Sequence, residues 1–249
     1  MKTQEKNFDG IKLSGFTAIL IMLALTGTAI YLLSLPQTPS IIAGVICGIC
    51  VVVMLPGFMI IQPNNSRVLT FFGRYAGTVI SNGFYWVNPL FLKSTVTLRI
   101  LNLNIDPIKV NDKVGNPIMI GAVVVWRIKD TYKASFDISG NIREFVQIQS
   151  DAALRQVAGM YAYDTNETID KVTLRSDDSG EITQRLEDEL NSRLAIAGIE
   201  IVEARINYLA YASEIASVML RRQQADAIIS ARERIVEGAV SMVHLALEK

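Results

Sequence analysis

The chain has 249 residues, half of them hydrophobic and 19% charged, and its 24 basic and 24 acidic residues give a formal net charge of zero. This hydrophobicity excludes an intrinsically disordered chain, and the neutral balance excludes an overall basic field of the kind that attracts nucleic acid. Its two cysteines and one histidine also exclude a disulfide framework, a four-thiolate zinc site and an imidazole-based metal cluster.

The charged residues are unevenly distributed along the chain. Residues 13–66 contain no Asp, Glu, Lys or Arg, and they include two apolar runs of 21 residues, 15–35 and 41–61. Each run has the ~20 residues that a helix needs to cross the hydrocarbon core of a bilayer. Two prolines in the linking residues 36–40 interrupt the helical pattern. The sequence therefore predicts a helical hairpin over residues 13–61, which either spans the membrane or enters it as a re-entrant wedge.

The flanks of the hairpin predict its orientation. An even number of crossings leaves both ends of the hairpin on one side of the membrane. The linker is uncharged, whereas basic residues lie outside both runs: Lys2, Lys6, Lys12, Arg67 and Arg74. By the positive-inside rule, the N-terminal residues 1–12 and everything after residue 61 are expected to face the cytoplasm from a plasma or inner cell membrane.

Residues 62–212 predict an α+β domain. Alternating, β-branched or aromatic runs predict strands at 68–72, 94–105 and 118–126, with a turn at 112–117 before the last of them. These strands are expected to form a mainly antiparallel sheet.

Two helices are predicted to pack on this sheet. A capping box that begins at Asn141 opens the first helix, whose expected apolar positions are Phe145, Ile148, Ala152 and Val157. The second helix ends at Gly198, and its apolar residues recur every four positions: Ile182, Leu186, Leu190 and Leu194. One more strand is predicted over residues 199–208.

Aromatic and basic residues that follow the hairpin predict a membrane-interface surface, because aromatic rings favour the headgroup level. We assign to this surface Arg67, Arg74, Phe84, Tyr85, Trp86, Phe91 and Lys93. Residues 67–113 carry six basic and two acidic residues, a balance that suits contact with anionic lipid. The alternative is that the aromatic rings belong to the core of the sheet.

Residues 213–249 are predicted to form one long helix with an oligomerising seam. A 3-4 spacing of heptad type, which favours a left-handed coiled coil, runs through Ile215, Val218, Ala225, Ile229, Arg232, Val236, Ala239 and Val243. The small seam residues suit close packing of many parallel helices better than an isolated pair. The alternative is a single amphipathic helix that folds back on the sheet. The sequence stops without a capping residue, so the helix is expected to be cut short here.

The residues give little sign of catalysis. His244 lies alone among apolar residues of the terminal helix, and neither a glycine-rich phosphate loop nor a His-Glu-x-x-His motif occurs. A Ser/Lys dyad stays open, although nothing singles one out. The acidic run Asp177, Asp178, Glu181 and 187–189 is either a solvated helix face or a lateral contact with arginines of a neighbouring subunit.

The order and spacing of these segments resemble the stomatin/prohibitin/flotillin (SPFH, band 7) superfamily over about residues 60–249. One such segment is Asn82-Gly-Phe-Tyr-Trp-Val-Asn-Pro89, similar to a Gly-aromatic-Pro segment of the family. The others are 61–69, 72–78, 113–118, 122–127, 149–155, 198–205 and 222–232. The preceding hairpin resembles the stomatin-like, membrane-anchored branch. Relatives carry more helix and a tail after this point.

The resemblance implies a non-enzymatic membrane scaffold without a cofactor. Such proteins form large homo- or hetero-oligomeric rings or cages, organise lipid microdomains and restrain partners such as NfeD-like proteins, membrane proteases or channels. A membrane-tethered hydrolase, or a regulatory subunit of a protease or channel, is the alternative. No nucleic-acid partner is expected.

Overall fold

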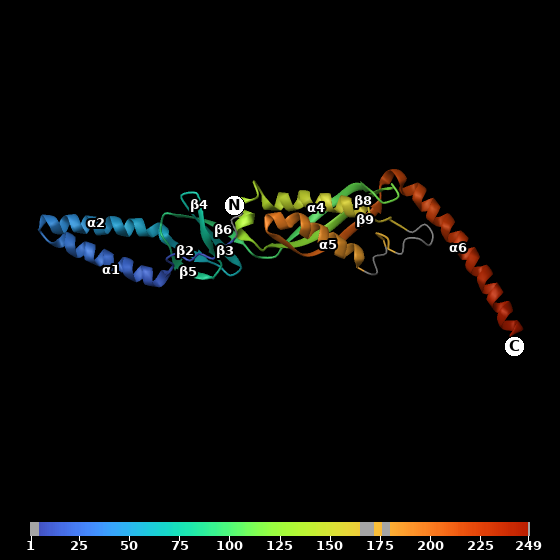
Figure 1. The fold of residues 1–249 in the computed structure, drawn as a ribbon, viewed down its shortest axis with the longest axis horizontal. Helices are drawn as coiled ribbons and strands as arrows, with labels where there is room; N and C mark the ends of the chain where they lie inside the picture. The colour runs from blue at the N-terminus through green and yellow to red at the C-terminus, as the bar shows by residue number, and fades with distance from the viewer. Residues whose placement is uncertain (1–4, 165–171, 176–179, 249) are drawn as a thin grey trace. The chain divides into compact units, whose positions relative to one another are not determined.

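A computed structural model of the chain describes residues 5–164, 172–175 and 180–248; the predicted flanking Lys2 and the acidic Asp177 and Asp178 lie outside the described residues. It contains helices and antiparallel strands in the order that Figure 1 labels. Packing divides the chain into two compact units, each described by itself below. The first holds the hairpin and the small strands, and the second holds the C-terminal helix.

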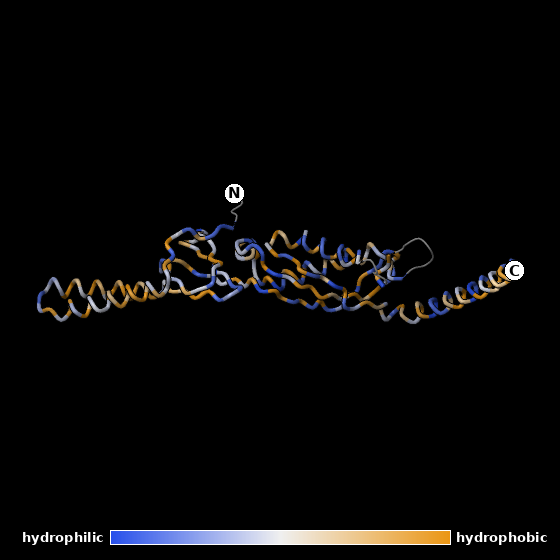
Figure 2. Tube along the Cα trace, turned by 90° about the horizontal axis from the view of Figure 1, so that it is seen from below, coloured by the Kyte–Doolittle hydropathy of each residue, from blue (hydrophilic) through white to orange (hydrophobic). Residues whose placement is uncertain are grey.

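Two apolar helices, α1 (Gly15–Ser34) and α2 (Thr38–Met54), form the predicted hairpin. Apolar residues lie all round both helices (Figure 2), and few of them are buried. By length and composition, Gly15–Ser34 and Thr38–Gly57 can each cross a membrane. The helices approach closely at Gly44, where an added Cβ would lie 3.1 Å from the Ala29 carbonyl oxygen. A helix that is hydrophobic on every side requires an apolar environment, and the described residues of the chain leave most of α1 and α2 uncovered.

The second apolar run was predicted to be helical to Ile61, and this is wrong for its last residues. The helix ends at Met54, a 3₁₀ turn covers Leu55–Gly57, and Phe58–Ile61 is strand β2. Pro56 carries no backbone N–H and so cannot extend the helical hydrogen bonds. Gly57 is packed so closely that a Cβ there would overlap the Trp86 indole. The chain therefore turns from helix to strand at this Pro-Gly pair.

The first unit contains two three-stranded sheets. One has the order β1 (Leu13–Ser14), β5 (Gly83–Trp86), β2, and the other has the order β4 (Arg74–Val79), β3 (Asn65–Phe71), β6 (Phe91–Thr97). All of these pairings are antiparallel. Their shared core is a cluster of buried side chains: Met59, Ile61, Leu69, Val79 and Val87.

The N-terminal segment adds to the edge of β4. Phe8 N–H donates to the Thr78 carbonyl and Thr78 N–H donates to the Lys6 carbonyl, both at 3.0 Å. The Phe8 ring packs on the core and meets Phe91 edge-on, with 5.4 Å between ring centroids. Glu5 accepts a hydrogen bond of 2.6 Å from the buried Thr131 hydroxyl. Residues 5–8 therefore form a strap that covers the open edge of this sheet, which we call the N-terminal strap.

Removal of the Phe8 ring is expected to destabilise the first unit. Phe8→Ala should cost about 2 kcal/mol, less than a fully buried phenylalanine, because the ring is only half-buried. The midpoint of thermal unfolding of the detergent-solubilised protein measures this cost. Asp9→Ala, at an exposed neighbour, is the control and should leave the midpoint unchanged. Equal midpoints for the two variants would show that the strap does not contribute to the fold.

The third sheet is built from the longest strands: β7 (Leu101–Asn111), β8 (Pro117–Ile128) and β9 (Ile199–Tyr211), in that order. Ala212 N–H donates to the Pro117 carbonyl at 3.0 Å and Lys129 N–H donates to the Gly198 carbonyl at 2.8 Å. The start of β8 thus lies beside the end of β9, so the two strands are antiparallel. The strand predicted at 118–126 is confirmed.

The single strand predicted at 94–105 is wrong, because the chain changes sheets within it. It forms the end of β6 and the beginning of β7, separated at Leu98–Ile100. Leu98 N–H donates to the Asn64 carbonyl at 2.9 Å, and Ile100 is 56% exposed whereas Val96 is buried. The alternation of apolar residues continues from β6 into β7, so it does not show that the two strands belong to different sheets. Only the pairing of the strands shows this.

The predicted helices are present, with one face misassigned. Helix α5 (Glu181–Leu194) buries all four predicted residues and is followed by a 3₁₀ turn at Ala195–Ala197, after which Gly198 adopts φ 68°. Helix α4 (Ile142–Ala158) follows Asn141, whose side chain accepts from Arg143 N–H at 2.9 Å. Of its predicted apolar positions Ile148 is 58% exposed, and the buried side chains are Val146, Ser150, Ala153, Leu154, Val157 and Ala158. A short helix, α3 (Thr131–Phe136), precedes it.

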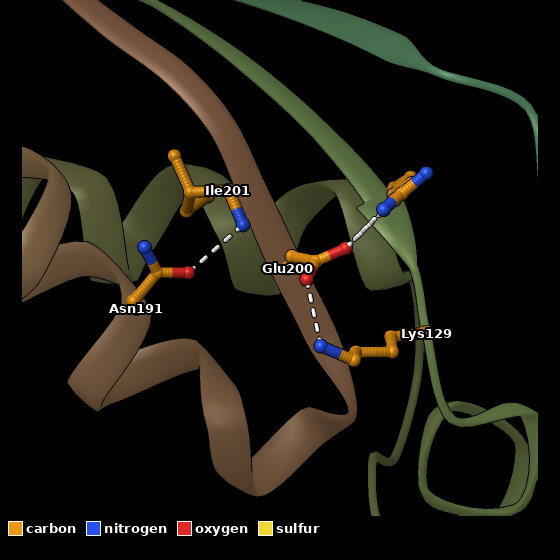
Figure 3. A network of polar contacts seen from close by, with 5 residues as sticks. Lys129, Asn191, Glu200 and Ile201 are labelled. Atoms are coloured by element: carbon orange, nitrogen blue, oxygen red, sulfur yellow. Dashed lines mark hydrogen bonds and ion pairs between the residues drawn. The ribbon is translucent and has the colours of Figure 1, made fainter.

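A polar network fastens β9 to β8 and α5 in the first unit (Figure 3). The Glu200 carboxylate accepts 2.7 Å hydrogen bonds from Lys129 Nζ and Arg127 Nε. The Asn191 side chain accepts from Ile201 N–H at 3.0 Å. The hydrogen bonds from Lys129 and then Arg127 hold the pKa of Glu200 below its ordinary value of 4.5.

The lowered pKa of Glu200 predicts a pH dependence of stability. A carboxyl group whose pKa is lower in the folded state stabilises the fold above its unfolded pKa of 4.5, and this stabilisation disappears as the pH falls through the folded pKa. Glu200→Gln should therefore lower the thermal midpoint at pH 7, with a difference from wild type that vanishes in acid. The exposed Glu237→Gln serves as control. A difference that stays constant down to pH 3 would contradict the ion-pair explanation.

Helix α6 (Ser213–Leu247) has 35 residues, and none of those described is buried. Ile215, Met219 and Gln223, one turn apart, are half-buried at its beginning. The apolar residues farther along are exposed, for example Ile229 at 55% and Val236 at 61%. The helix predicted for residues 213–249 is confirmed as a helix, and its assembly into a coiled coil stays a prediction.

Candidate membrane-interface site

Both ends of the hairpin are attached to one strand, β5. On one side of β5, Leu13 pairs with Trp86 and Ser14 with Tyr85, immediately before α1 begins. On its other side Phe58 pairs with Trp86 and Ile61 with Gly83, immediately after the 3₁₀ turn that ends α2. The two helices therefore leave from a single three-stranded sheet. Whatever membrane the hairpin enters, the N-terminal strap and the sheets of this unit lie on the same side of it.

The side chains of β5 that face the helices hold the ends of the hairpin in place. Phe84 stacks on Phe58 and meets Phe16 edge-on, each with 5.6 Å between ring centroids. Gly15 lies against the Phe84 ring, where a Cβ would overlap it. Trp86 Nε1 donates a 3.0 Å hydrogen bond to the Met54 carbonyl. This carbonyl belongs to the last turn of α2, where backbone oxygens have no partner within the helix.

Tyr85 lies on the opposite face of β5, as the alternation of a strand requires. Its ring packs against the core cluster, and its hydroxyl donates to the Asn82 carbonyl at 3.2 Å. The Lys12 ammonium lies 4.8 Å from the centroid of the Tyr85 ring, within the range of a cation–π interaction. The predicted aromatic surface is thus divided: Phe84 and Trp86 contact the helix ends, and Tyr85 contacts the core.

Lys93 is the basic residue nearest the end of α2. Its ammonium donates to the Pro56 carbonyl and, at 3.4 Å, to the Phe58 carbonyl. A cation at the carboxyl end of a helix neutralises the partial negative charge of the free carbonyls there. Burial, with repulsion from Arg67 as the lesser cause, lowers the pKa of Lys93 below its ordinary value. Lys93 therefore caps the hairpin from within the protein.

The remaining predicted interface residues occupy different environments. Arg67 is half-buried in β3, opposite Thr95 of β6. Phe91 packs on the core beside Phe8 and Phe71, so the alternative prediction of a core role fits it best. Arg74 is exposed at the first position of β4, next to the turn that follows β3. The structure brings Phe84, Trp86 and Lys93 together at the end of α2 and the beginning of β2, whereas Tyr85 lies on the other face of β5.

The contacts of Phe16, Phe58 and Lys12 were not predicted. Phe16 and Phe58 lie within the two apolar runs, where hydropathy does not distinguish a lipid-facing ring from one that packs on a sheet. Lys12 was interpreted only as a flanking charge. The sequence feature that could have indicated these contacts is the Pro56-Gly57 pair, because it marks the point where the chain leaves the helix and begins β2.

A second polar region, in the other unit, surrounds the beginning of α6. A cavity of about 360 Å³ is lined by residues that include Tyr211 and Arg222. Asp164 beside it accepts 3.0 Å hydrogen bonds from Arg175 Nη1 and from Gln223 Nε2 of α6. Burial, followed by repulsion from Asp164, raises the pKa of Tyr211 to about 12. Since its charged groups pair with one another, we interpret this region as a structural junction for α6.

Other candidate chemical groups have structural surroundings. Glu187 of the acidic run accepts from Ala204 N–H at 3.1 Å, and Glu181 accepts from the Tyr161 hydroxyl at 3.2 Å. His244 is exposed on α6. Within residues 5–164, 172–175 and 180–248, no group of three or more His, Cys, Asp or Glu side chains could hold a metal ion.

The indole of Trp86 is expected to stabilise the end of the hairpin through its N–H. Trp86→Phe keeps an aromatic ring but leaves the Met54 carbonyl without a donor, which should cost about 1 kcal/mol. Tyr85→Phe is the matched control, because it removes an exposed hydroxyl and should cost less than about 0.5 kcal/mol. Thermal unfolding in detergent measures both, and equal losses would contradict the proposed role of the indole.

Comparison with known proteins adds one match. Residues 59–239 match the family model described as SPFH domain / Band 7 family. No curated protein matches the chain.

Proposed function

The chain belongs to the SPFH domain / Band 7 family, and we propose that it is a non-enzymatic, membrane-anchored scaffold of the stomatin-like branch. The observation that carries this proposal is the attachment of both ends of an apolar hairpin to β5 of the matched domain. A domain tied in this way at two points is held at the membrane surface. Two apolar helices and membership of a membrane-associated family support membrane association.

Lipid is the environment that the hairpin requires. Soluble monomers rarely expose contiguous apolar patches larger than a few hundred Å². In α1 and α2, large side chains such as Phe16, Leu20, Ile46 and Val52 are more than half exposed. Burial of such surface contributes roughly 25 cal/mol per Å², so insertion of the hairpin into a bilayer is strongly favoured.

We propose that the matched domain faces the cytoplasm. Lys6 and Lys12 precede the first helix, Arg67 and Lys93 lie near the end of the second, and the linker at the hairpin tip has no charge. The positive-inside rule favours this orientation, in a plasma or inner cell membrane.

Helix α6 is the proposed oligomerising element. Its 35 residues extend about 50 Å, and beyond its half-buried first turns its large apolar residues are exposed among the described residues of the chain. Parallel copies that pack along Val218, Ala225, Ile229 and Val236 would bury them. Alanine at several seam positions permits the close approach that a ring or cage of many helices needs.

Such an assembly would act by physical confinement. A ring of membrane-anchored subunits encloses a patch of bilayer and restrains or excludes the membrane proteins within it. We propose a large homo-oligomer that organises membrane microdomains, with an NfeD-like protein, a membrane protease or a channel as client. The family is generally non-enzymatic, which agrees with the prediction of a scaffold.

Charges placed in the seam should prevent assembly without releasing the protein from the membrane. Ile229→Asp with Val236→Asp buries two carboxylates in any α6 interface, whereas the hairpin is untouched. We expect the large particle seen on native gels and by light scattering in detergent to fall to small species. Carbonate extraction should still leave the protein in the membrane fraction.

The matched control is Ile228→Asp with Ile235→Asp, which makes the same change one residue earlier, where the side chains are 55% and 72% exposed. This pair should leave particle size intact. An unchanged particle size for the seam variant would refute the proposal that these residues form the interface. Loss of assembly in both variants would show that the interface is not specific to the seam positions.

A further inference from the structure

A cavity of about 360 Å³ lies beside the start of β3 in the first unit. It begins at the end of β2, within a few residues of the helix that precedes this strand. The residues that line it carry hydrogen-bond donors of three kinds: the Arg67 guanidinium, the side-chain amides of Gln62 and Asn65, which are joined by a 3.5 Å hydrogen bond, and the Thr95 hydroxyl. A guanidinium with neighbouring amide and hydroxyl donors is suited to the oxygens of a phosphate group.

No acidic residue balances the charge of this region. Residues 10–105 contain five basic residues, Lys12, Arg67, Arg74, Lys93 and Arg99, and not one Asp or Glu. None of the ion pairs found among the described residues involves Arg67. Arg67 is half-buried, and it has no carboxylate counterion among the residues that the structure describes.

A second cation strengthens the field at the cavity. In the β3–β6 ladder, Arg67 pairs with Thr95 and Leu69 pairs with Lys93, which places Arg67 and Lys93 diagonally across neighbouring strands. Repulsion from Arg67 contributes to the lowered pKa of Lys93. An anion at Arg67 would relieve this repulsion.

The cavity also has an apolar margin. Ile60 of β2 lines the cavity, and its side chain is 64% exposed. Strand β2 follows directly from the hairpin. A free phosphate ion would use only the polar donors. A lipid uses both parts, because its phosphate can meet Arg67 while its glycerol and acyl region contacts Ile60.

We propose that this cavity binds the phosphate of an anionic phospholipid headgroup, with Arg67 as the principal ligand. Gln62, Asn65 and Thr95 supply further hydrogen-bond donors. Lys93 stays bonded to the Pro56 carbonyl and adds its positive charge to the electrostatic potential at the cavity. This inference rests on the proposed membrane anchoring, and it assigns to the anchored domain a specific lipid contact that the hairpin alone would not provide.

The test uses the full chain, delipidated in a non-ionic detergent, and short-chain phosphatidylglycerol as the probe. Binding is measured by microscale thermophoresis, with short-chain phosphatidylcholine and inorganic phosphate as the comparison ligands. We expect phosphatidylglycerol to bind at least tenfold more tightly than either. Equal binding of phosphatidylcholine would overturn the preference for an anionic headgroup, and equal binding of inorganic phosphate would overturn the lipid as ligand.

Variants of the cavity locate the site. Arg67→Gln should weaken phosphatidylglycerol binding ~10-fold or more, because a hydrogen bond to a charged group contributes about 1.5–3 kcal/mol. Arg67→Lys should recover part of this affinity, since the charge remains without the bidentate geometry. Arg74→Gln makes the same charge change at an exposed position and should leave binding within about twofold. Equal losses for Arg67→Gln and Arg74→Gln would refute the site in favour of diffuse charge attraction.

Two further measurements separate this inference from the proposed function. Thr95→Val removes a lining donor without a change of charge and should weaken binding a few-fold, which keeps the test valid if Arg67→Gln folds poorly. Carbonate extraction and particle size should stay at wild-type values in both variants. Retained anchoring and assembly with unchanged lipid affinity would refute the headgroup site alone, whereas loss of anchoring in the wild type would refute the scaffold.

Discussion

The arrangement of the first unit depends on the antiparallel pairing of β5 with strands on both sides. Strand β5 is only four residues long, yet β1 and β2, the segments that enter and leave the hairpin, both pair with it. A single helix anchor followed by a flexible linker would leave a domain free to tilt and to move away from the lipid. Here the helix ends are held by backbone pairing, by the Trp86 and Lys93 hydrogen bonds and by the Phe84 ring contacts. In the proposed membrane-anchored assembly, a domain at a fixed height presents the same side chains to the headgroups in every subunit.

Charge distribution follows from this attachment. A carboxylate near an anionic surface is unfavourable, and basic residues near it are stabilised by about 1 kcal/mol each at most. The stretch from residue 10 to residue 105, which contains the hairpin and the two small sheets of the first unit, has no acidic residue. The compensating acidic residues come later in the sequence, so the zero net charge of the chain is the cancellation of two segments of opposite character. The neutral composition therefore results from charges of opposite sign that are separated along the sequence.

Sequence patterns identified the parts of the fold that depend on local spacing. The hairpin followed from the absence of charge over 54 residues, and the buried face of α5 followed from apolar residues at four-residue intervals. Features that depend on distant partners were not predictable in this way. Phe58–Ile61 is as apolar as the helix before it, and only its pairing with β5 makes it a strand. The N-terminal strap on β4 and the contact of Lys93 with the 3₁₀ turn after α2 also join residues far apart in sequence.

The proposed anchoring also bears on the proposed assembly of subunits. In that assembly every hairpin enters one bilayer with the same orientation, and the copies of α6 pack parallel to one another. The Gln223–Asp164 hydrogen bond and the Lys109–Glu214 ion pair fix the first turns of α6 in the second unit, and the seam residues beyond them stay exposed. Confinement to a membrane also raises the effective concentration of subunits, as a short linker does for two tethered binding sites. In the proposed assembly, a seam with alanine at two positions, Ala225 and Ala239, is too weak to hold an isolated pair in solution and is sufficient because the membrane supplies orientation and proximity.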